Sequence, residues 1–295
     1  MDIGIGLPST IPGIPGRLIL DWAAAAEQAG FSTLATIDRV VYPNLETVPT
    51  LAAAAAVTER IGLTTAVLIA PFRGNGALLA KQLATVDTIS GGRLRVGVAV
   101  GPREDDYARR DRRSRDRGRI LDQQLAELRA VWAQRPRGHA VPIGPAPVRP
   151  GGPPLFIGGN VAATFRRIAE FGTGWIFGGG GPEPFAAGAD QVGRAWREAG
   201  RAGEPRLVVN AYVSLGPDAE YHARRYLGDY YGFTGDFAEQ IVAGALTSPK
   251  AVTDVMTAYE DAGCDEMILF PCNPDLAQIS LIVEAARADR HRKTP

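Results

Sequence analysis

The chain has few of the residues that build metal sites or disulfide frameworks. Two cysteines, Cys264 and Cys272, and three histidines, His139, His222 and His291, occur among its 295 residues. Two cysteines are too few for a disulfide framework. The histidines are scattered and show no metal-ligand spacing. The sequence therefore predicts a protein without a metal centre, in which both cysteines are buried small residues.

Long apolar runs and an excess of one charge are also missing. No segment approaches the roughly 20 apolar residues needed to cross a bilayer. The first ten residues, MDIGIGLPST, lack the positive start and apolar core of a signal peptide. Lys and Arg number 32, as do Asp and Glu, so the formal net charge is zero. We therefore expect a soluble, cytoplasmic protein that binds neither nucleic acid nor a membrane.

What the sequence does contain is a regular alternation of short apolar runs and longer helical patterns. Near-continuous apolar strands that alternate with helices favour a parallel sheet of the α/β class. Eight runs are expected as strands: residues 3–7, 33–37, 63–69, 94–100, 155–157, 175–177, 207–215 and 266–270. Helices are expected between them, including residues 17–29, 47–60, 77–89 and 118–134.

Eight such units in a chain of this length fit a closed (β/α)8 barrel, the TIM barrel. A doubly wound open sheet is the alternative, because periodicity cannot show closure. No composition break resembles an interdomain linker, so we expect one domain over residues 1–295. Residues 216–249 are expected to elaborate the seventh strand-to-helix connection.

A glycine pair stands where the fifth apolar run becomes a helix. Gly158 and Gly159 leave the backbone N–H groups of Asn160 and Val161 open to a ligand, and Thr164 follows one turn later. Unpaired N–H groups and the helix dipole favour an anion at such a helix start. The alternative is a tight turn in which Asn160 caps the helix. No dinucleotide fingerprint or Walker loop is present.

The same stretch, GGNVAAT followed by GTGWIF, resembles the flavin-phosphate loop of the bacterial luciferase-like monooxygenase family. Residues 59–107, from ERIGLTTAVLIAPFRGNG to GVAVGPREDDY, and the segment AYEDAGCDEMILFP at 258–271 carry the resemblance over essentially the whole chain. It implies a TIM barrel that binds FMN or the deazaflavin coenzyme F420, and a homodimer.

The resemblance also implies where the cofactor lies. The phosphate is expected on the glycine loop, and the ring across the barrel mouth, near the ends of strands three, four and six. Relatives hold a non-proline cis peptide in strand three, which here falls near Val67–Leu68. The residues expected to bind the cofactor are Val67, Leu68, Gly158, Gly159, Asn160, Val161, Thr164, Gly178 and Gly179.

Three positions depart from the luciferase pattern. Asp38, Ala99 and Val100 stand where luciferase α-subunits carry a catalytic histidine, a reactive cysteine and a phosphate-holding arginine. We therefore do not expect light emission, although the fold is unaffected.

Asp38, Arg39 and Glu104 are the candidate catalytic residues. Asp38 could receive or return a proton at the end of strand two, and Arg39 could hold a substrate anion; alternatively, the two form a local ion pair. Arg73 could meet phosphate or substrate, or lie over the rim. The resemblance places Glu104, in GPREDDY, in a region that contacts the deazaflavin or substrate in relatives.

Two segments leave further alternatives open. The basic run at residues 108–119 is a solvated loop or a lip that attracts the anionic tail of a deazaflavin. Tyr226, Tyr230, Tyr231 and Phe233 form either an apolar lid over the substrate or an interhelical core.

The sequence thus predicts an oxidoreductase that uses F420 or FMN on a small organic substrate. F420 would transfer hydride, and reduced FMN would react with oxygen and oxygenate the substrate; the Asp38–Arg39 pair favours F420 slightly. The alternative is a non-catalytic flavin-binding protein that stores or scavenges a flavin. A non-redox, aldolase-like barrel is disfavoured, since Lys81, Lys250 and Lys293 do not end strands.

Overall fold

Eight parallel strands form a closed barrel in chain order. The computed structural model describes residues 1–108, 114–134 and 141–292. Every strand pairs with its neighbours in sequence, and β8 pairs with β1, which confirms the closed (β/α)8 barrel and excludes the open sheet. The strands are β1 Asp2–Gly6, β2 Thr33–Thr36, β3 Gly62–Ile69, β4 Leu94–Ala99, β5 Leu155–Gly158, β6 Gly174–Phe177, β7 Arg206–Val213 and β8 Glu266–Pro271.

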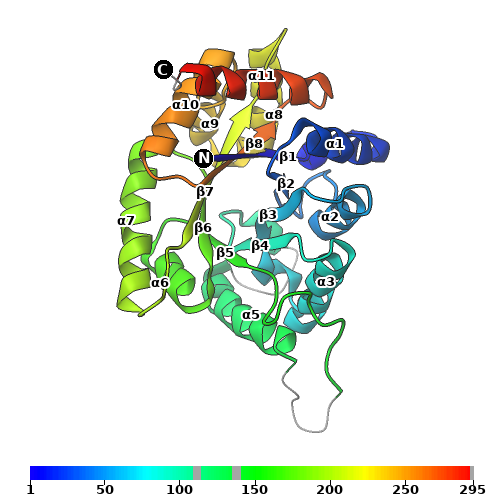
Figure 1. The fold of residues 1–295 in the computed structure, drawn as a ribbon, viewed down its shortest axis with the longest axis vertical. Coiled ribbons are helices and arrows are strands. Elements are labelled where there is room, and N and C mark those ends of the chain that lie inside the picture. The colour runs from blue at the N-terminus through cyan, green and yellow to red at the C-terminus, as the bar shows by residue number, and fades with distance from the viewer. Residues whose placement is uncertain (109–113, 135–140, 293–295) are drawn as a thin grey trace.

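Helices surround the barrel, and the N-terminus lies near the centre of the ring in the view of Figure 1. The outer helices are α1 Gly16–Ala29, α2 Thr47–Ala56, α3 Gly76–Ile89, α5 Arg117–Trp132, α6 Ala162–Phe171, α7 Pro182–Glu198, α10 Pro249–Asp261 and α11 Ala277–Arg292. A short α4, Asp105–Ala108, follows β4. The long seventh connection contains α8 Ala219–Tyr231 and α9 Phe237–Ala243, as expected of an elaborated loop.

Helix α2 is shorter than its alanine-rich pattern predicts. It ends at Ala56, before Arg60. The Glu27 carboxylate of α1 accepts hydrogen bonds from the backbone N–H groups of Glu59, Arg60 and Ile61, at 2.6–3.1 Å. These bonds hold the chain out of the helix, so a tertiary contact overrides the local helix propensity.

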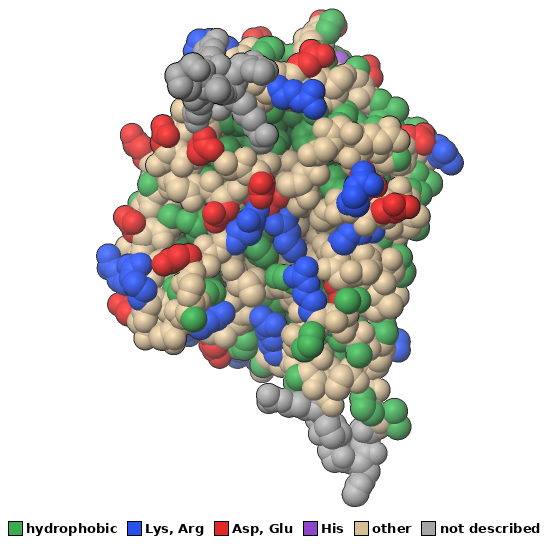
Figure 2. Space-filling view, viewed as in Figure 1, with side chains coloured by type: hydrophobic (Ala, Val, Ile, Leu, Met, Phe, Trp, Pro, Cys, Tyr) green, Lys and Arg blue, Asp and Glu red, His purple; other side chains and the backbone are tan. Residues whose placement is uncertain are grey.

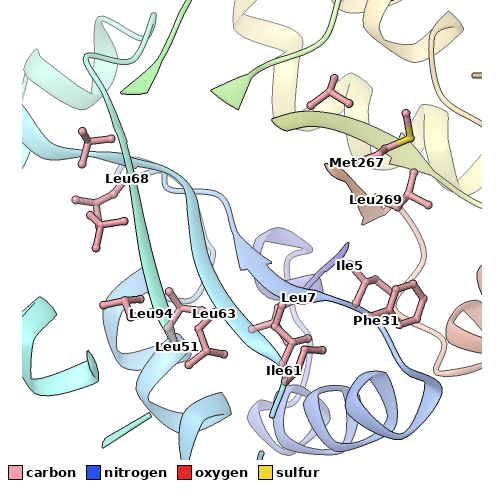
Figure 3. Packing of buried hydrophobic residues seen from close by; sticks show 14 of the residues in the cluster. Ile5, Leu7, Phe31, Leu51, Ile61, Leu63, Leu68, Leu94, Met267 and Leu269 are labelled. Atoms are coloured by element: carbon pink, nitrogen blue, oxygen red, sulfur yellow. The ribbon is translucent and has the colours of Figure 1, made fainter. Parts of the chain in front are cut away.

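Two apolar layers build the core. The outer layer lies between strands and helices, where Leu51 of α2, Leu63 of β3 and Leu94 of β4 belong to one buried cluster (Figure 3). The inner layer fills the barrel with side chains from alternating strand positions: Ala35, Ala66, Phe156, Ile176, Val208, Ile268 and Phe270. The barrel is therefore a packed core, and a ligand can bind only at one of its ends.

The amino-terminal end of the barrel is closed by a buried ion cluster. Arg95 donates to the Glu266 carboxylate at 2.5 Å, Ser32 donates to it at 2.7 Å, and Arg206 lies 3.3 Å from it. Burial alone would raise the pKa of Glu266, but the hydrogen bonds and charge of Arg95, with the Ser32 hydroxyl, lower that pKa to about 2. On the face that Figure 2 displays, basic side chains gather near the centre with acidic ones beside them.

Within the described residues, no helix is long and apolar enough to span a membrane. The same residues contain no group of His, Cys, Asp and Glu side chains that could hold a metal ion. Cys264 and Cys272 are both free and buried, which confirms their expected role as small core residues.

Candidate functional site

The glycine loop at the end of β5 can be built only from glycine. Gly159 has a φ of +120°, a region that side chains disfavour, and a Cβ there would lie 2.8 Å from Oγ1 of Thr164. A Cβ on Gly158 would lie 2.9 Å from Val67 and 3.3 Å from Ala99. The loop therefore joins the ends of β3, β4 and β5, with the buried Thr164 hydroxyl directly beneath it.

Helix α6 begins without a side-chain cap. Val161 occupies the N-cap position and is 61% exposed, so the expectation that Asn160 caps the helix is wrong. None of the hydrogen bonds recorded for the described residues is donated by the N–H groups of Asn160 or Val161. A valine cannot accept the bonds that a cap would take. The exposed helix start is therefore free to bind an anion.

Arginines border the start of α6. A cavity of about 300 Å³ is lined by Val100, Arg115, Arg117, Gly118, Ala163 and Arg167. Arg167 is held by Asp122 at 2.6 Å and by the Gly118 carbonyl at 3.0 Å. The ion pairs of the described residues include none for Arg115 or Arg117. These two side chains provide positive charge beside α6, although position 100 carries valine.

Part of the basic run at residues 108–119 lines this cavity. Residues 109–113 lie outside the described part of the chain, so the basic lip remains a prediction there. The high arginine content of this run was the feature of the sequence that pointed to Arg115 and Arg117. What the sequence could not indicate was their place beside the glycine loop, because that depends on how α5 packs on α6.

The two residues of β3 that were predicted to bind the cofactor, Val67 and Leu68, lie in different layers of the barrel. A non-proline cis bond joins Ala66 and Val67, one residue before the position expected. Val67 packs with the inner cluster of the barrel, whereas Leu68 is fully buried in the outer layer. Only the backbone of Leu68 can therefore contact a ligand at the mouth.

Asn210 reaches this point from the opposite side of the barrel. Its Nδ2 donates to the Ala66 carbonyl at 2.8 Å, and its Oδ1 is buried without a partner. Buried polar atoms are nearly always hydrogen-bonded, so this oxygen marks a place where a ligand donor fits. Asn210 and Tyr212 alternate along β7, a pattern that lets both side chains point into the mouth but does not predict this contact.

A second glycine run follows β6. Gly179, Gly180 and Gly181 all have positive φ angles. A Cβ on Gly178 would meet nothing within 4 Å, and one on Gly179 would lie 3.6 Å from the Asn210 carbonyl oxygen. The run therefore lies beside β7 at the mouth and leaves its backbone accessible.

Asp38 forms an ion pair with Arg73 rather than with Arg39. Both carboxylate oxygens lie 3.0 Å from Nη2 of Arg73. The Ile69 N–H donates to Oδ2 at 2.9 Å, and Thr47 donates to Oδ1 at 3.2 Å. Arg73 also pairs with Glu46. This buried carboxylate therefore braces the loops after β2 and β3, and its catalytic role stays a prediction.

Arg39 instead meets a second arginine that sequence reasoning did not identify. Arg39 donates to the Tyr230 carbonyl at 3.0 Å and lies 3.4 Å from Asp105, which is 40% exposed. Arg103, after β4, donates to the same carbonyl. Its guanidinium lies 3.6 Å from the ring centre of Phe233 and 4.7 Å from that of Tyr230.

Glu104 remains apart from these groups. It is exposed, and no side-chain hydrogen bond or ion pair is recorded for it among the described residues. The structure thus places Asp38 and Arg39 in separate networks and Glu104 in neither. The proposed catalytic roles of all three residues remain predictions.

The aromatic residues of the seventh connection pack over the barrel mouth. Tyr226 hydrogen-bonds Thr10 at 2.6 Å, and Tyr231 hydrogen-bonds Tyr212 of β7 at 2.6 Å. Tyr226 and Tyr230 are buried, while Phe233 is 42% exposed. The burial of Tyr226 and Tyr230 in a cluster between α8 and α9 confirms the interhelical core for these two residues, and the lid over a substrate stays a prediction.

Comparison with known proteins shows the family of the chain. The family model described as luciferase-like monooxygenase matches residues 1–269. An uncharacterized protein of Mycobacterium tuberculosis is 34% identical over 171 residues, 54% of this chain and 58% of the relative. The match therefore spans little more than half of that relative's length. An FMNH2-dependent dimethylsulfone monooxygenase of Pseudomonas putida is 29% identical over 227 residues, covering 70% of this chain and 55% of that protein.

Among solved structures, an F420-dependent secondary alcohol dehydrogenase in complex with an F420–acetone adduct superposes with a TM-score of 0.82. It is 17% identical, and the alignment covers 98% of this chain and 99% of the other. At this identity the likeness supports the fold alone.

Proposed function

Because the chain belongs to the luciferase-like monooxygenase family, we propose that it is an oxidoreductase that uses F420 or FMN to transform a small organic substrate. The relatives named above include both an FMNH2-dependent and an F420-dependent enzyme. The observation that carries the proposal is the uncapped start of α6 behind Gly158 and Gly159.

The residues present fit the phosphate of such a cofactor. Gly159 allows the backbone a close approach, and Thr164 lies beneath it. The N–H groups of Asn160 and Val161 are free of recorded partners, and Arg117 lines the adjoining cavity. Each charge-assisted hydrogen bond to a phosphate contributes about 1.5–3 kcal/mol. Two or three such bonds are enough for firm binding.

The barrel mouth fits the ring of the cofactor. Val67 offers an apolar surface beside Gly158, and the buried Oδ1 of Asn210 offers an unused acceptor. Gly178 and Gly179 leave room for close backbone approach. When bound, either cofactor supplies the redox chemistry, hydride transfer for F420 and oxygenation for reduced FMN. The protein contributes position, exclusion of water and any proton transfer by its own side chains.

From the family alone we also propose a homodimer, which light scattering tests.

The test is reconstitution of the purified protein with each cofactor separately. Binding is followed by quenching of cofactor fluorescence in the wild type and in Gly159→Ala. We expect the variant to lose about tenfold or more in affinity, the loss of one phosphate hydrogen bond. Gly200→Ala is the matched control, because Gly200 also has a positive φ, +65°, but lies on the surface after α7.

The outcomes separate the possibilities. The proposal is wrong if the wild type binds neither cofactor, or if Gly159→Ala binds as tightly as Gly200→Ala. The cofactor that binds more tightly identifies the redox chemistry. A tightly bound cofactor that no alcohol, imine, alkene or oxygen oxidises or reduces would instead favour the storage function.

A further inference from the structure

Arg39 and Arg103 place two buried positive charges on one carbonyl oxygen. The side chain of Arg39 is 8% exposed, and Arg103 is 5% exposed. Both donate to the Tyr230 carbonyl near the C-terminus of α8. A carbonyl and a helix end supply only partial negative charge. Two guanidinium groups that share one acceptor repel each other.

Neither nearby carboxylate forms a buried ion pair with the two arginines. Asp105 lies 3.4 Å from Arg39 but is 40% exposed, so water weakens that ion pair. Asp106 is buried, yet it accepts the backbone N–H groups of Val40 and Val41 at 3.1 and 2.8 Å. Burial lowers the pKa of Arg103 and the charge of Arg39 lowers it as well, while the charges of Asp105 and Asp106 act in the opposite direction. Neither carboxylate, however, satisfies all the buried donors of the two arginines.

Each arginine also keeps a buried donor without a partner. These donors are Nε of Arg39 and Nη1 of Arg103. An unsatisfied buried donor costs about 1–3 kcal/mol, and more when it is charged. An oxyanion satisfies such donors, since the planar guanidinium matches the geometry of a carboxylate. The cost is therefore explained if a ligand group completes the site.

The surroundings favour a ligand with an apolar or aromatic body. The rings of Tyr42 and Tyr230 lie 4.3 and 5.2 Å from the Arg39 guanidinium. A cavity of about 490 Å³ adjoins them, lined by Val40, Val41, Tyr42 and Pro43. Phe233 is exposed, whereas the Arg103 guanidinium beneath its ring is buried.

The position of the pair separates it from the cofactor phosphate. Arg39 follows β2, Arg103 follows β4, and the Tyr230 carbonyl belongs to α8. The phosphate site lies instead on the β5–α6 loop and the start of α5. We infer that Arg39 and Arg103 form a recognition site for a carboxylate-type oxyanion on the organic substrate. This inference rests on the proposed function and narrows its substrate class to anionic compounds.

Equilibrium binding tests the site without turnover. Isothermal titration calorimetry measures the affinity of the cofactor-saturated wild type for benzoate and for neutral benzamide, which has the same shape. We expect saturable binding of benzoate and binding at least tenfold weaker for benzamide. Equal affinities, or no saturable binding of benzoate, would overturn the inference.

Variants assign the effect to the two arginines. Arg39→Gln and Arg103→Gln are each expected to weaken benzoate binding at least tenfold. The control Arg225→Gln removes one charge from the exposed surface of α8 and should bind benzoate as the wild type does. Benzoate affinity unchanged in Arg39→Gln contradicts the assignment. If Arg103→Gln fails to fold, Arg39→Gln and the comparison of benzoate with benzamide in the wild type still test the inference.

The cofactor must be measured in the same variants. If the wild type binds neither FMN nor F420, the proposed function fails, and benzoate is then titrated against the cofactor-free protein to judge the site by itself. If instead Arg39→Gln loses F420 affinity tenfold only for the form that carries its anionic tail, the pair holds the cofactor, and the substrate assignment is wrong.

Discussion

The contacts of single residues at the mouth determine what each of them can do. Asp38 carries four hydrogen-bond contacts from Arg73, Ile69 and Thr47, and its side chain is 2% exposed. Arg103, by contrast, is equally buried but lacks a full set of partners. A fully hydrogen-bonded carboxylate is typical of a structural brace, whereas the unpaired donor of Arg103 leaves a place for a further acceptor.

Replacement of Asp38 should therefore act on stability. Asp38→Asn leaves Arg73, 15% exposed, with Glu46 as its remaining ion-pair partner. We expect a loss of about 3 kcal/mol in the free energy of unfolding, as for other broken buried pairs, with cofactor affinity retained. Denaturant unfolding measures it. The control Asp21→Asn removes an exposed pair with Arg17 and should cost less than about 1 kcal/mol. Equal effects in the two variants would contradict the bracing role.

At the level of elements, helix α6 begins without a side-chain cap at the place where we propose that a phosphate binds. A side-chain acceptor caps α2, α3 and α10, for example Asn75 before α3 and Ser248 before α10, whereas α1, α5, α7, α8 and α9 begin without one. Helix α6 has Val161 there. A missing cap costs about 1 kcal/mol, which a bound anion would offset.

Val161→Asp should accordingly change stability and affinity in opposite directions. The new carboxylate caps α6, so the cofactor-free protein should gain about 1 kcal/mol of unfolding free energy. It also repels the phosphate, so FMN and F420 should bind more than about tenfold less tightly. Thermal unfolding and fluorescence titration measure the two effects. Val161→Asn, a neutral cap, should gain similar stability with a smaller loss of affinity. An Asp variant that binds as tightly as the Asn variant would place the phosphate elsewhere.

At the scale of the whole molecule, the barrel is held by an ion cluster at one end and opens at the other. Glu266 of β8 contacts Ser32 before β2, Arg95 of β4 and Arg206 of β7. One carboxylate thus links strands from across the barrel. The residues proposed to bind ligands gather at the opposite end because the strands are parallel and their carboxyl ends meet there.

Acid should weaken this linkage through Glu266. Its folded-state pKa is about 2, below the ordinary 4.5, so its contribution is complete above pH 4.5 and is lost as pH falls toward 2. The shift corresponds to a loss on the order of 3 kcal/mol over that window. Denaturant unfolding at pH 7, 5 and 3 measures it. Glu266→Gln should be less stable at pH 7 and lose less stability on acidification. The control Glu239→Gln, at an exposed pair with Arg224, should follow the wild type. An identical pH dependence in Glu266→Gln would contradict the assignment.

The sequence by itself determined the alternation of strands and helices and the glycine loop before α6. Both are written in local patterns, apolar periodicity and residues without side chains, which act over a few neighbouring residues. The long seventh connection was predictable for the same reason. Resemblance added the expectation of an F420 or FMN cofactor, because its motifs extend over most of the chain.

Only the tertiary structure decided which side chains meet. Asp38 and Arg73 are separated by 35 positions, and Arg103 and Tyr230 by 127. Asp38 is followed directly by Arg39, yet the two belong to different networks. Partners at such separations depend on barrel closure and on how α8 packs over the mouth. No local period encodes those distances, and for that reason the brace at Asp38 and the arginine pair emerged only from the folded chain.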